Sequence, residues 1–325
     1  MSLSRNTINT RMRAFEIITE DAQTKRMVLK ALGKLPDEAP IFPQVYKQIV
    51  GEPLGNRMSN YINSRGDQDA IKAAKWLVQT IPTLGDAKEV KEFIKKFSNP
   101  EFDPINSKAL VPSGGMQQPA EILSIVTDPF AKKLFEKIFH EFSGKTDAGP
   151  GEAALAILSP NITYGSPGDI VVNGIKIEVK ASRSAKGSAG RIWDMPINQK
   201  PALKIVEPLG ITSFTVLDGE QPFPDPQLAK SFIEAVSEGW FGEVHPDLVS
   251  KFGKPGFKEA WHTHVFDTYK QHGGWTGVLA LGLTTFQYVE TGEQFAKYMK
   301  KYNHGNLIKA NEKQSRGLAP QIMVK

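Results

Sequence analysis

Residues 168–180 have the sequence GDIVVNGIKIEVK, and this segment predicts a β-hairpin. Asn-Gly between two β-branched runs is the strongest short-range signal for a two-residue turn that joins antiparallel strands. A turn at residues 173–174 sets the register of the two strands and pairs Asp169 with Glu178. Directly paired residues have Cβ atoms roughly 4.5–5.5 Å apart, so these two carboxylates are expected to lie side by side.

The two faces of this hairpin differ in polarity, because side chains alternate along a strand. One face is apolar and is expected to pack against a core; it comprises Ile170, Val172, Ile175, Ile177 and Val179. The other face is polar and is expected to face water; it comprises Asp169, Val171, Lys176, Glu178 and Lys180. Two carboxylates about 4 Å apart repel by about 4 kcal/mol at an effective dielectric near 20. A shared divalent cation would offset this repulsion, and the alternative is an exposed strand face whose mixed charges block aggregation.

These residues resemble the active-site motif of the PD-(D/E)XK nuclease superfamily, which includes restriction endonucleases, Holliday-junction resolvases and phage exonucleases. The resemblance rests on Asp169 and on Glu178-Val179-Lys180 of the next strand. It implies an α/β fold with a mixed sheet and a restriction-endonuclease-like αβββαβ core over about residues 120–325. The proline that precedes the family's aspartate is displaced here, since Pro167 lies two places before Asp169.

The resemblance also implies roles for individual residues. Asp169 and Glu178 would bind Mg2+, for which Mn2+ substitutes, together with the backbone carbonyl of Val179. Lys180 would lie near the attacking water. Glu152 matches a further glutamate that many members carry on the helix before the first strand. A divalent ion of this kind lowers the pKa of bound water and neutralises charge on the phosphate, and an ammonium beside it stabilises the same charge.

The segment after the hairpin, ASRSAKGSAGR at residues 181–191, combines small and basic residues. Small residues let a backbone approach closely, and basic side chains bind phosphate. The predicted DNA contacts are Lys176, Ser182, Arg183, Lys186 and Arg191. The alternative is a surface loop without a ligand.

The chain is expected to form two domains. Apolar periodicity predicts that residues 1–110 form a helical domain, which would contact DNA, a partner or a second copy in a homodimer. The resemblance implies that residues 111–325 form the nuclease domain. Residues 98–119, rich in Pro, Ser, Gly and Asn, are the predicted linker. The elements expected within the nuclease domain are a helix over 120–142, a helix from Glu152, a helical insertion around 222–272, a strand over 275–289, a helix over 291–302 and a strand over 319–325.

The composition excludes several kinds of chemistry. The 325 residues include no cysteine, which rules out disulfides, thiolate catalysis and Cys-ligated zinc. The net charge of +5, from 40 basic and 35 acidic side chains, permits a polyanionic partner. The sequence has neither a run of about 18 apolar residues nor the apolar core of a signal peptide, so we expect no membrane contact and a cytoplasmic location.

The histidines are predicted to bind no metal. His262 and His264 are two residues apart on a predicted helix and therefore do not share a face. The other histidines are isolated in the sequence; they are His140, His245, His272 and His304.

The function expected from the sequence is Mg2+-dependent hydrolysis of DNA by an endonuclease of a phage, mobile element or defence system. A junction resolvase or an exonuclease would use the same residues. A hypothesis of another class is a non-catalytic DNA-binding or virion structural protein that keeps a nuclease-like fold, against which the retention of Asp169, Glu178 and Lys180 argues.

Overall fold

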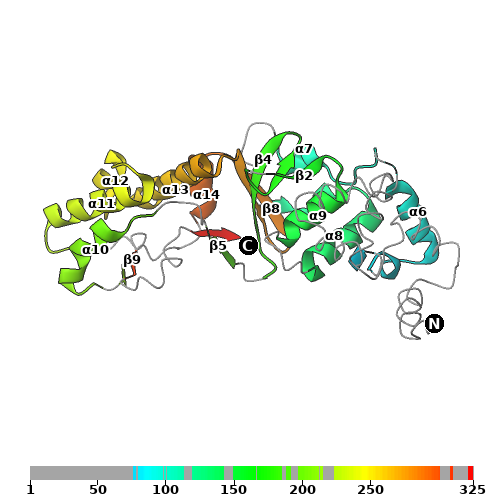
Figure 1. Ribbon diagram of the computed structural model, residues 1–325, viewed down its shortest axis with the longest axis horizontal. Coiled ribbons are helices and arrows are strands. Elements are labelled where there is room, and N and C mark those ends of the chain that lie inside the picture. The colour runs from blue at the N-terminus through cyan, green and yellow to red at the C-terminus, as the bar shows by residue number, and fades with distance from the viewer. Residues whose placement is uncertain are drawn as a thin grey trace, which may run out of the picture. The chain divides into compact units, whose positions relative to one another are not determined.

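The structure is a computed structural model (Figure 1). The residues that it describes are 76–77, 80–97, 99, 101–112, 119–142, 149–165, 167–184, 188–191, 197–211, 213–214, 223–300, 308–309 and 321–324. The chain divides into two compact units, of which unit 1 comprises Met1–Val111 and Glu121–Val179, and unit 2 comprises Pro112–Ala120 and Lys180–Lys325. Most of the predicted helical domain at 1–110 lies outside the described residues, so that domain stays a prediction.

A six-stranded mixed sheet confirms the α/β class, with strand order β1-β8-β7-β4-β3-β2. Its strands are β1 (Ala120–Glu121), β2 (Ile162–Tyr164), β3 (Ile170–Val172), β4 (Ile175–Ala181), β7 (Gly277–Leu281) and β8 (Thr285–Val289). Neighbouring strands are antiparallel from β2 to β4 and between β7 and β8. Two smaller antiparallel pairs are β5 (Ser188–Arg191) with β10 (Gln321–Val324) and β6 (Ser213–Phe214) with β9 (Ile308–Lys309).

Strands β3 and β4 form the predicted hairpin. The ladder pairs Val172 with Ile175, and its last pair is Ile170 with Ile177, as the sequence predicted. Both turn residues have positive φ, 51° at Asn173 and 83° at Gly174, which is the conformation that a two-residue type I′ turn requires. The predicted apolar face is buried at Ile170, Val172, Ile177 and Val179 and partly buried at Ile175.

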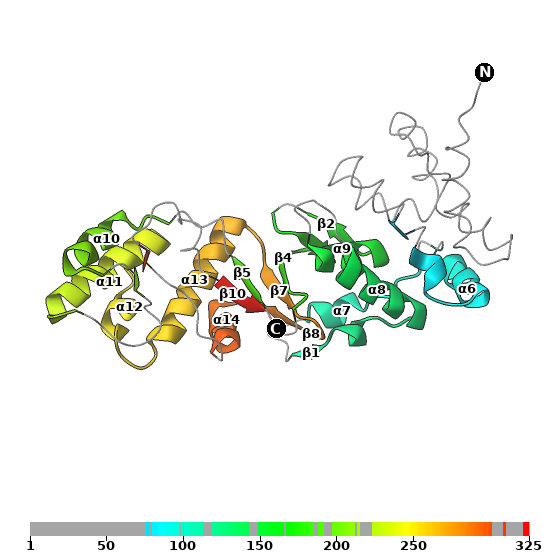
Figure 2. The ribbon, with the colours of Figure 1, turned by 90° about the horizontal axis from the view of Figure 1, so that it is seen from below.

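Unit 1 also contains several helices. They are η2 (Ile81–Thr83), α6 (Ala87–Phe97), α7 (Ser107–Leu110), η3 (Ile122–Ile125), α8 (Pro129–Glu141) and α9 (Pro150–Leu158). Helix α9 packs against α8 on one side and against β2 on another (Figure 2). Every residue from Gly151 to Leu158 is buried, which is the pattern of a helix covered all round.

Two predictions about this region are wrong. The helix predicted over 120–142 begins only at Pro129, because Asp128 caps its N-terminus and proline is favoured at the first helical position. The part of the predicted linker between 101 and 112 is packed, with Ile105 and Leu110 buried. Its Asp103 also accepts hydrogen bonds from the side chains that follow α9, at Ser159 (2.9 Å) and Asn161 (2.8 Å).

Asp128 gives a testable link between pH and stability. Burial raises the pKa of this carboxyl, but hydrogen bonds from the N–H groups of Ala131 and Phe130 and an ion pair with Lys96 at 2.9 Å outweigh burial and hold the pKa below its usual value. The stabilisation is therefore present above about pH 4, the pKa of an unfolded aspartate, and is lost as the pH falls through the lowered folded value. We expect Asp128→Ala to lower the free energy of unfolding by about 1–2 kcal/mol at pH 7 and by clearly less at pH 2.5, measured by urea unfolding.

Asp225→Ala, which removes the exposed N-cap bond to Leu228, is the control. An equal loss at both pH values would contradict the assignment.

Unit 2 is helical over most of residues 222–272, where the sequence predicted helices. The helices of this unit are α10 (Lys200–Val206), η4 (Glu207–Leu209), α11 (Pro226–Phe241), α12 (Pro246–Lys251), α13 (Phe257–Gly273) and α14 (Gly292–Met299). The α-helices share a core that includes Phe232, Trp240 and Phe266, each at most 1% exposed. In the described part of the chain, no helix is both long and apolar enough to cross a bilayer.

The strand predicted over 275–289 is two strands. Residues 277–281 and 285–289 form β7 and β8, which pair antiparallel, and the N–H of Gly282 donates to the carbonyl of Thr285 at 2.7 Å between them. The prediction was wrong because the turn, Gly282-Leu283-Thr284, contains one turn-favouring residue among residues that also suit a strand.

Candidate functional site

Asp169 is placed at the start of the hairpin by its neighbour Gly168. Gly168 has φ +87°, and a Cβ at this position would lie 2.9 Å from the carbonyl oxygen of Ile177. The regular pairing of β3 with β4 ends at Ile170 and Ile177. The N–H of the next residue, Asp169, also donates to the carbonyl of Ile177, at 2.9 Å. The predicted pair of Asp169 with Glu178 is therefore not part of the ladder.

The carboxylate of Asp169 reaches β4 at the middle of the predicted motif. Its Oδ2 accepts a hydrogen bond from the backbone N–H of Val179 at 2.7 Å. That N–H lies between Glu178 and Lys180, whose side chains share one face of β4 because they are two residues apart. The half-buried Asp169 is therefore fixed within one residue of both partners that the sequence assigned to it.

The polar face of β4 is more buried than the sequence predicted. Glu178 is only 8% exposed, whereas Lys176 on the same face is exposed. Lys180 is half-buried, and its Nζ lies 5.8 Å from the centre of the Tyr269 ring on α13, within the range of a cation–π contact. The contact between Lys180 and Tyr269 could not be predicted from the sequence, since no local pattern links a helix residue to a strand far from it in the chain.

Glu152 is buried at the start of α9, 5% exposed. Its Oε1 lies 2.8 Å from the position that a Cβ on Gly149 would take, so the carboxylate folds back over the N-terminus of its own helix. A carboxylate is stabilised there by the positive end of the helix dipole. The structure thus places the carboxylate of Glu152 beside the N-terminus of α9.

The oxygen donors of the motif suit a hard cation. The carboxylates of Asp169 and Glu178 and the carbonyl of Val179 offer oxygen alone, which Mg2+ prefers. The three carboxylates of Glu152, Asp169 and Glu178 do not meet as a group in which all ligand atoms lie within 4.8 Å of one another. The fit to Mg2+ therefore rests on the two hairpin carboxylates and the carbonyl between Glu178 and Lys180.

Among the described residues, the ligand atoms of another group, His245, Asp247 and His264, do all lie within 4.8 Å of one another. The prediction that His245 is isolated is wrong, because packing of α12 against α13 brings it to His264. No sequence signal identified this group, since His264 lies on α13, whereas His245 and Asp247 lie at the start of α12.

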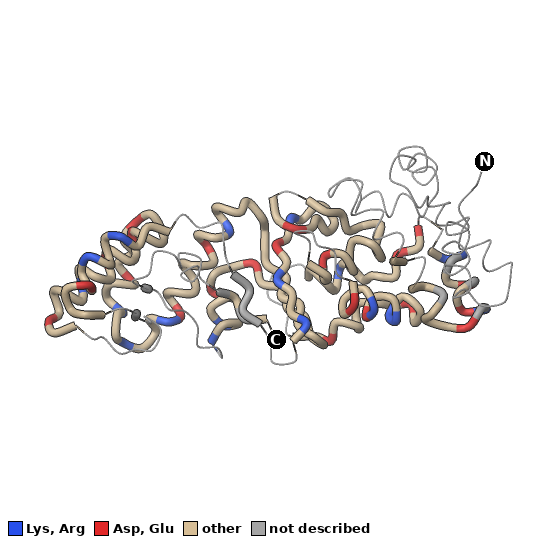
Figure 3. The backbone as a smooth tube through the Cα atoms, turned by 60° about the horizontal axis from the view of Figure 1, so that its bottom comes forward, with Lys and Arg blue, Asp and Glu red and all other residues tan. Residues whose placement is uncertain are grey.

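The predicted DNA contacts have different surroundings. Lys176 and Arg183 are exposed. Ser182 is 2% exposed, its N–H donates to the carbonyl of Leu281 at 2.8 Å, and its hydroxyl accepts from the N–H of Ser184, so it holds the start of the loop. Lys186 and the side chain of Arg191 lie outside the described residues. Figure 3 shows basic and acidic positions interspersed along the described elements. The predicted phosphate contacts therefore depend on the individual basic side chains named above.

Comparison of the chain with models of protein families, with curated proteins and with solved structures finds no match in any of the three.

Proposed function

We propose that this protein is a Mg2+-dependent DNA endonuclease of the PD-(D/E)XK type. The observation that carries the proposal is the hydrogen bond from the N–H of Val179 to Asp169 Oδ2. It joins the aspartate that precedes β3 to the Glu-x-Lys segment of β4, which supports a site shared by these residues. A hairpin face with merely dispersed charges has no need for this bond or for the burial of Glu178.

The order of elements supports the finer fold assignment. Along the chain, α9 is followed by β2, β3 and β4 and later by α13 and β7, which is a helix, three strands, a helix and a strand. The elements between β4 and α13 would then form the insertion. It would end before α13, whereas the sequence predicted an insertion around residues 222–272. The N-terminal domain would contact DNA, a partner or a second copy.

In the proposed reaction, Asp169 and Glu178 would hold the metal ion, with the carbonyl of Val179 as a further donor. The ion would lower the pKa of bound water and neutralise charge at the phosphate. Lys180 would orient the attacking water or stabilise the negative charge that develops on the phosphate oxygens. Glu152 is retained as a residue that would support the site from α9.

DNA would be held through phosphate contacts from the exposed Lys176 and Arg183, with Lys186 and Arg191 as further candidates. Such contacts position a duplex without reading its sequence. A DNA substrate fits the cytoplasmic location expected for a chain without cysteine.

The proposal is tested with the full-length chain on supercoiled plasmid, linear duplex, four-way junction and single-stranded DNA, each with Mg2+ or with EDTA. We expect nicking or linearisation of plasmid in Mg2+ and none in EDTA. Cutting only of junctions would identify the resolvase alternative, and cutting only from ends the exonuclease. Binding of DNA without cutting under every condition would favour the non-catalytic alternative.

A further inference from the structure

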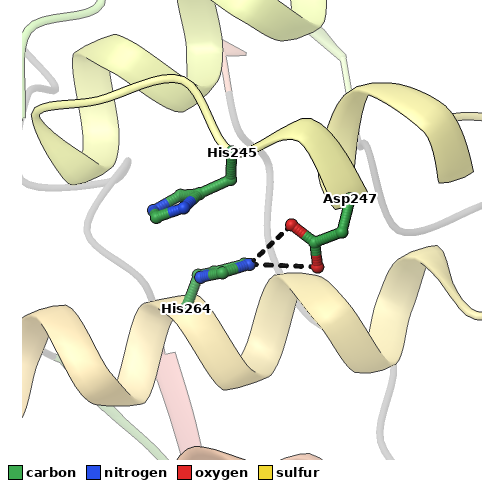
Figure 4. A group of neighbouring side chains, drawn as sticks. All are labelled: His245, Asp247 and His264. Atoms are coloured by element: carbon green, nitrogen blue, oxygen red, sulfur yellow. Dashed lines mark hydrogen bonds and ion pairs between the residues drawn. The ribbon is translucent and has the colours of Figure 1, made fainter.

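His245, Asp247 and His264 meet where α12 packs against α13 (Figure 4). His245 is the N-cap residue of α12, Asp247 lies in its first turn, and His264 lies on α13. The Nε2 of His264 is 3.0 Å from Oδ1 and 3.1 Å from Oδ2 of Asp247. The two imidazole rings stack with centres 3.8 Å apart and planes 15° apart.

The surrounding packing holds this group in place. The backbone N–H of His245 donates to the hydroxyl of Ser237 at 2.8 Å, and this fully buried hydroxyl donates in turn to the carbonyl of Glu243 at 3.0 Å. The ring of Phe241 lies 5.4 Å from that of His245 and 5.0 Å from that of Trp261. Helices α11, α12 and α13 therefore all fix the group, and its geometry does not depend on a surface loop alone.

We propose that His245, Asp247 and His264 form a binding site for a zinc-class divalent cation. Their ligand atoms all lie within 4.8 Å of one another. Tetrahedral zinc with bonds of about 2.0–2.2 Å needs ligand atoms roughly 3.3 Å apart, and the contact between His264 and Asp247 already has nearly that length.

This site is distinct in chemistry from the proposed nuclease centre. Two nitrogen donors and one oxygen donor suit zinc, whereas the oxygen donors at Asp169 and Glu178 suit Mg2+. The side chains of His264 and Asp247 are 21% and 44% exposed, so a cation reaches them from solvent and keeps a position for water. The site stands whether or not the chain cleaves DNA.

The test is titration of the metal-free full-length chain with ZnCl2, followed by calorimetry, with MgCl2 in parallel. We expect one zinc equivalent that His264→Gln or His245→Gln removes, and a rise in Tm of about 5–10 °C at a hundredfold excess over Kd. His272→Gln, at an exposed position on the same helix, should bind zinc as the unaltered chain does. Mg2+ should produce neither effect.

Cobalt provides a second measurement that does not depend on the stability of the histidine variants. Co2+ in a site with nitrogen donors and low coordination number gives visible absorption bands, which Asp247→Asn should weaken or shift while far-UV circular dichroism stays unchanged. Zinc binding that is equal in the unaltered chain and in both histidine variants would overturn the proposal, and the group would then be an ion pair with a purely structural role. The same conclusion would follow from cobalt bands that are identical with and without Asp247→Asn.

Discussion

Asp169→Asn is expected to lower the rate of Mg2+-dependent DNA cleavage by about a thousandfold while leaving the fold intact. Asparagine keeps an oxygen that accepts the N–H of Val179, which lies 2.7 Å away in the unaltered chain. It loses the negative charge that holds a divalent cation, and losses of this order follow removal of one electrostatic contribution to a transition state. Single-turnover cleavage of plasmid measures the rate, and urea unfolding measures the free energy of unfolding.

Two further variants sharpen this result. Lys180→Ala should lower the rate by a similar factor without changing the affinity for Mg2+, because the ammonium acts on the water or the phosphate. Asp225→Asn is the matched control, because it makes the same substitution at a carboxylate that also accepts a backbone N–H, at the N-terminus of α11. If cleavage survives both Asp169→Asn and Lys180→Ala, the proposed site is excluded.

Gly168→Ala is expected to lower the free energy of unfolding by about 3 kcal/mol. A left-handed backbone costs a residue with a Cβ about 1–2 kcal/mol. The new methyl group would also lie 2.9 Å from the carbonyl oxygen and 3.2 Å from the carbonyl carbon of Ile177, and relieving such a clash with backbone costs a further 1–3 kcal/mol or so. Any shift of the strand moves Asp169 away from Val179, so cleavage should fall together with stability.

Gly174→Ala is the control that separates the two contributions. Gly174 has φ +83°, close to that of Gly168, but a Cβ there would have no atom within 4 Å. We expect it to lower the free energy of unfolding by only about 1–2 kcal/mol and to leave cleavage unchanged. Equal losses in the two variants, measured by urea unfolding, would show that the contact with Ile177 carries no energy and would remove the explanation given for the position of Asp169.

The features predicted correctly from the sequence are those set by neighbouring residues. The turn at Asn173 and Gly174 and the pairing of Ile170 with Ile177 follow from local backbone preferences and the alternation of apolar residues. The end of regular pairing before Asp169 was not predicted, because it depends on a through-space contact between Gly168 and Ile177. Continuing the strand register from the turn to Asp169 takes no account of that contact.

Features set by tertiary packing were not predictable from local patterns. The burial of Glu178 depends on what covers β4, and alternation along a strand says only which side chains share a face. The histidine group was missed for a related reason. His262 and His264 are neighbours in sequence, whereas the ring that contacts His264 belongs to His245, which lies at the start of a separate helix.

The buried hydroxyl of Ser237 couples the interior of unit 2 to its surface chemistry. It donates to the carbonyl of Glu243 and accepts from the N–H of His245, so both ends of the segment 243–245 are tethered to α11 by hydrogen bonds. A cation bound at His245 would therefore be held by a residue whose backbone is hydrogen-bonded to α11. By thermodynamic reciprocity, substitutions in the helix core would then tune affinity for the ion without altering a single ligand.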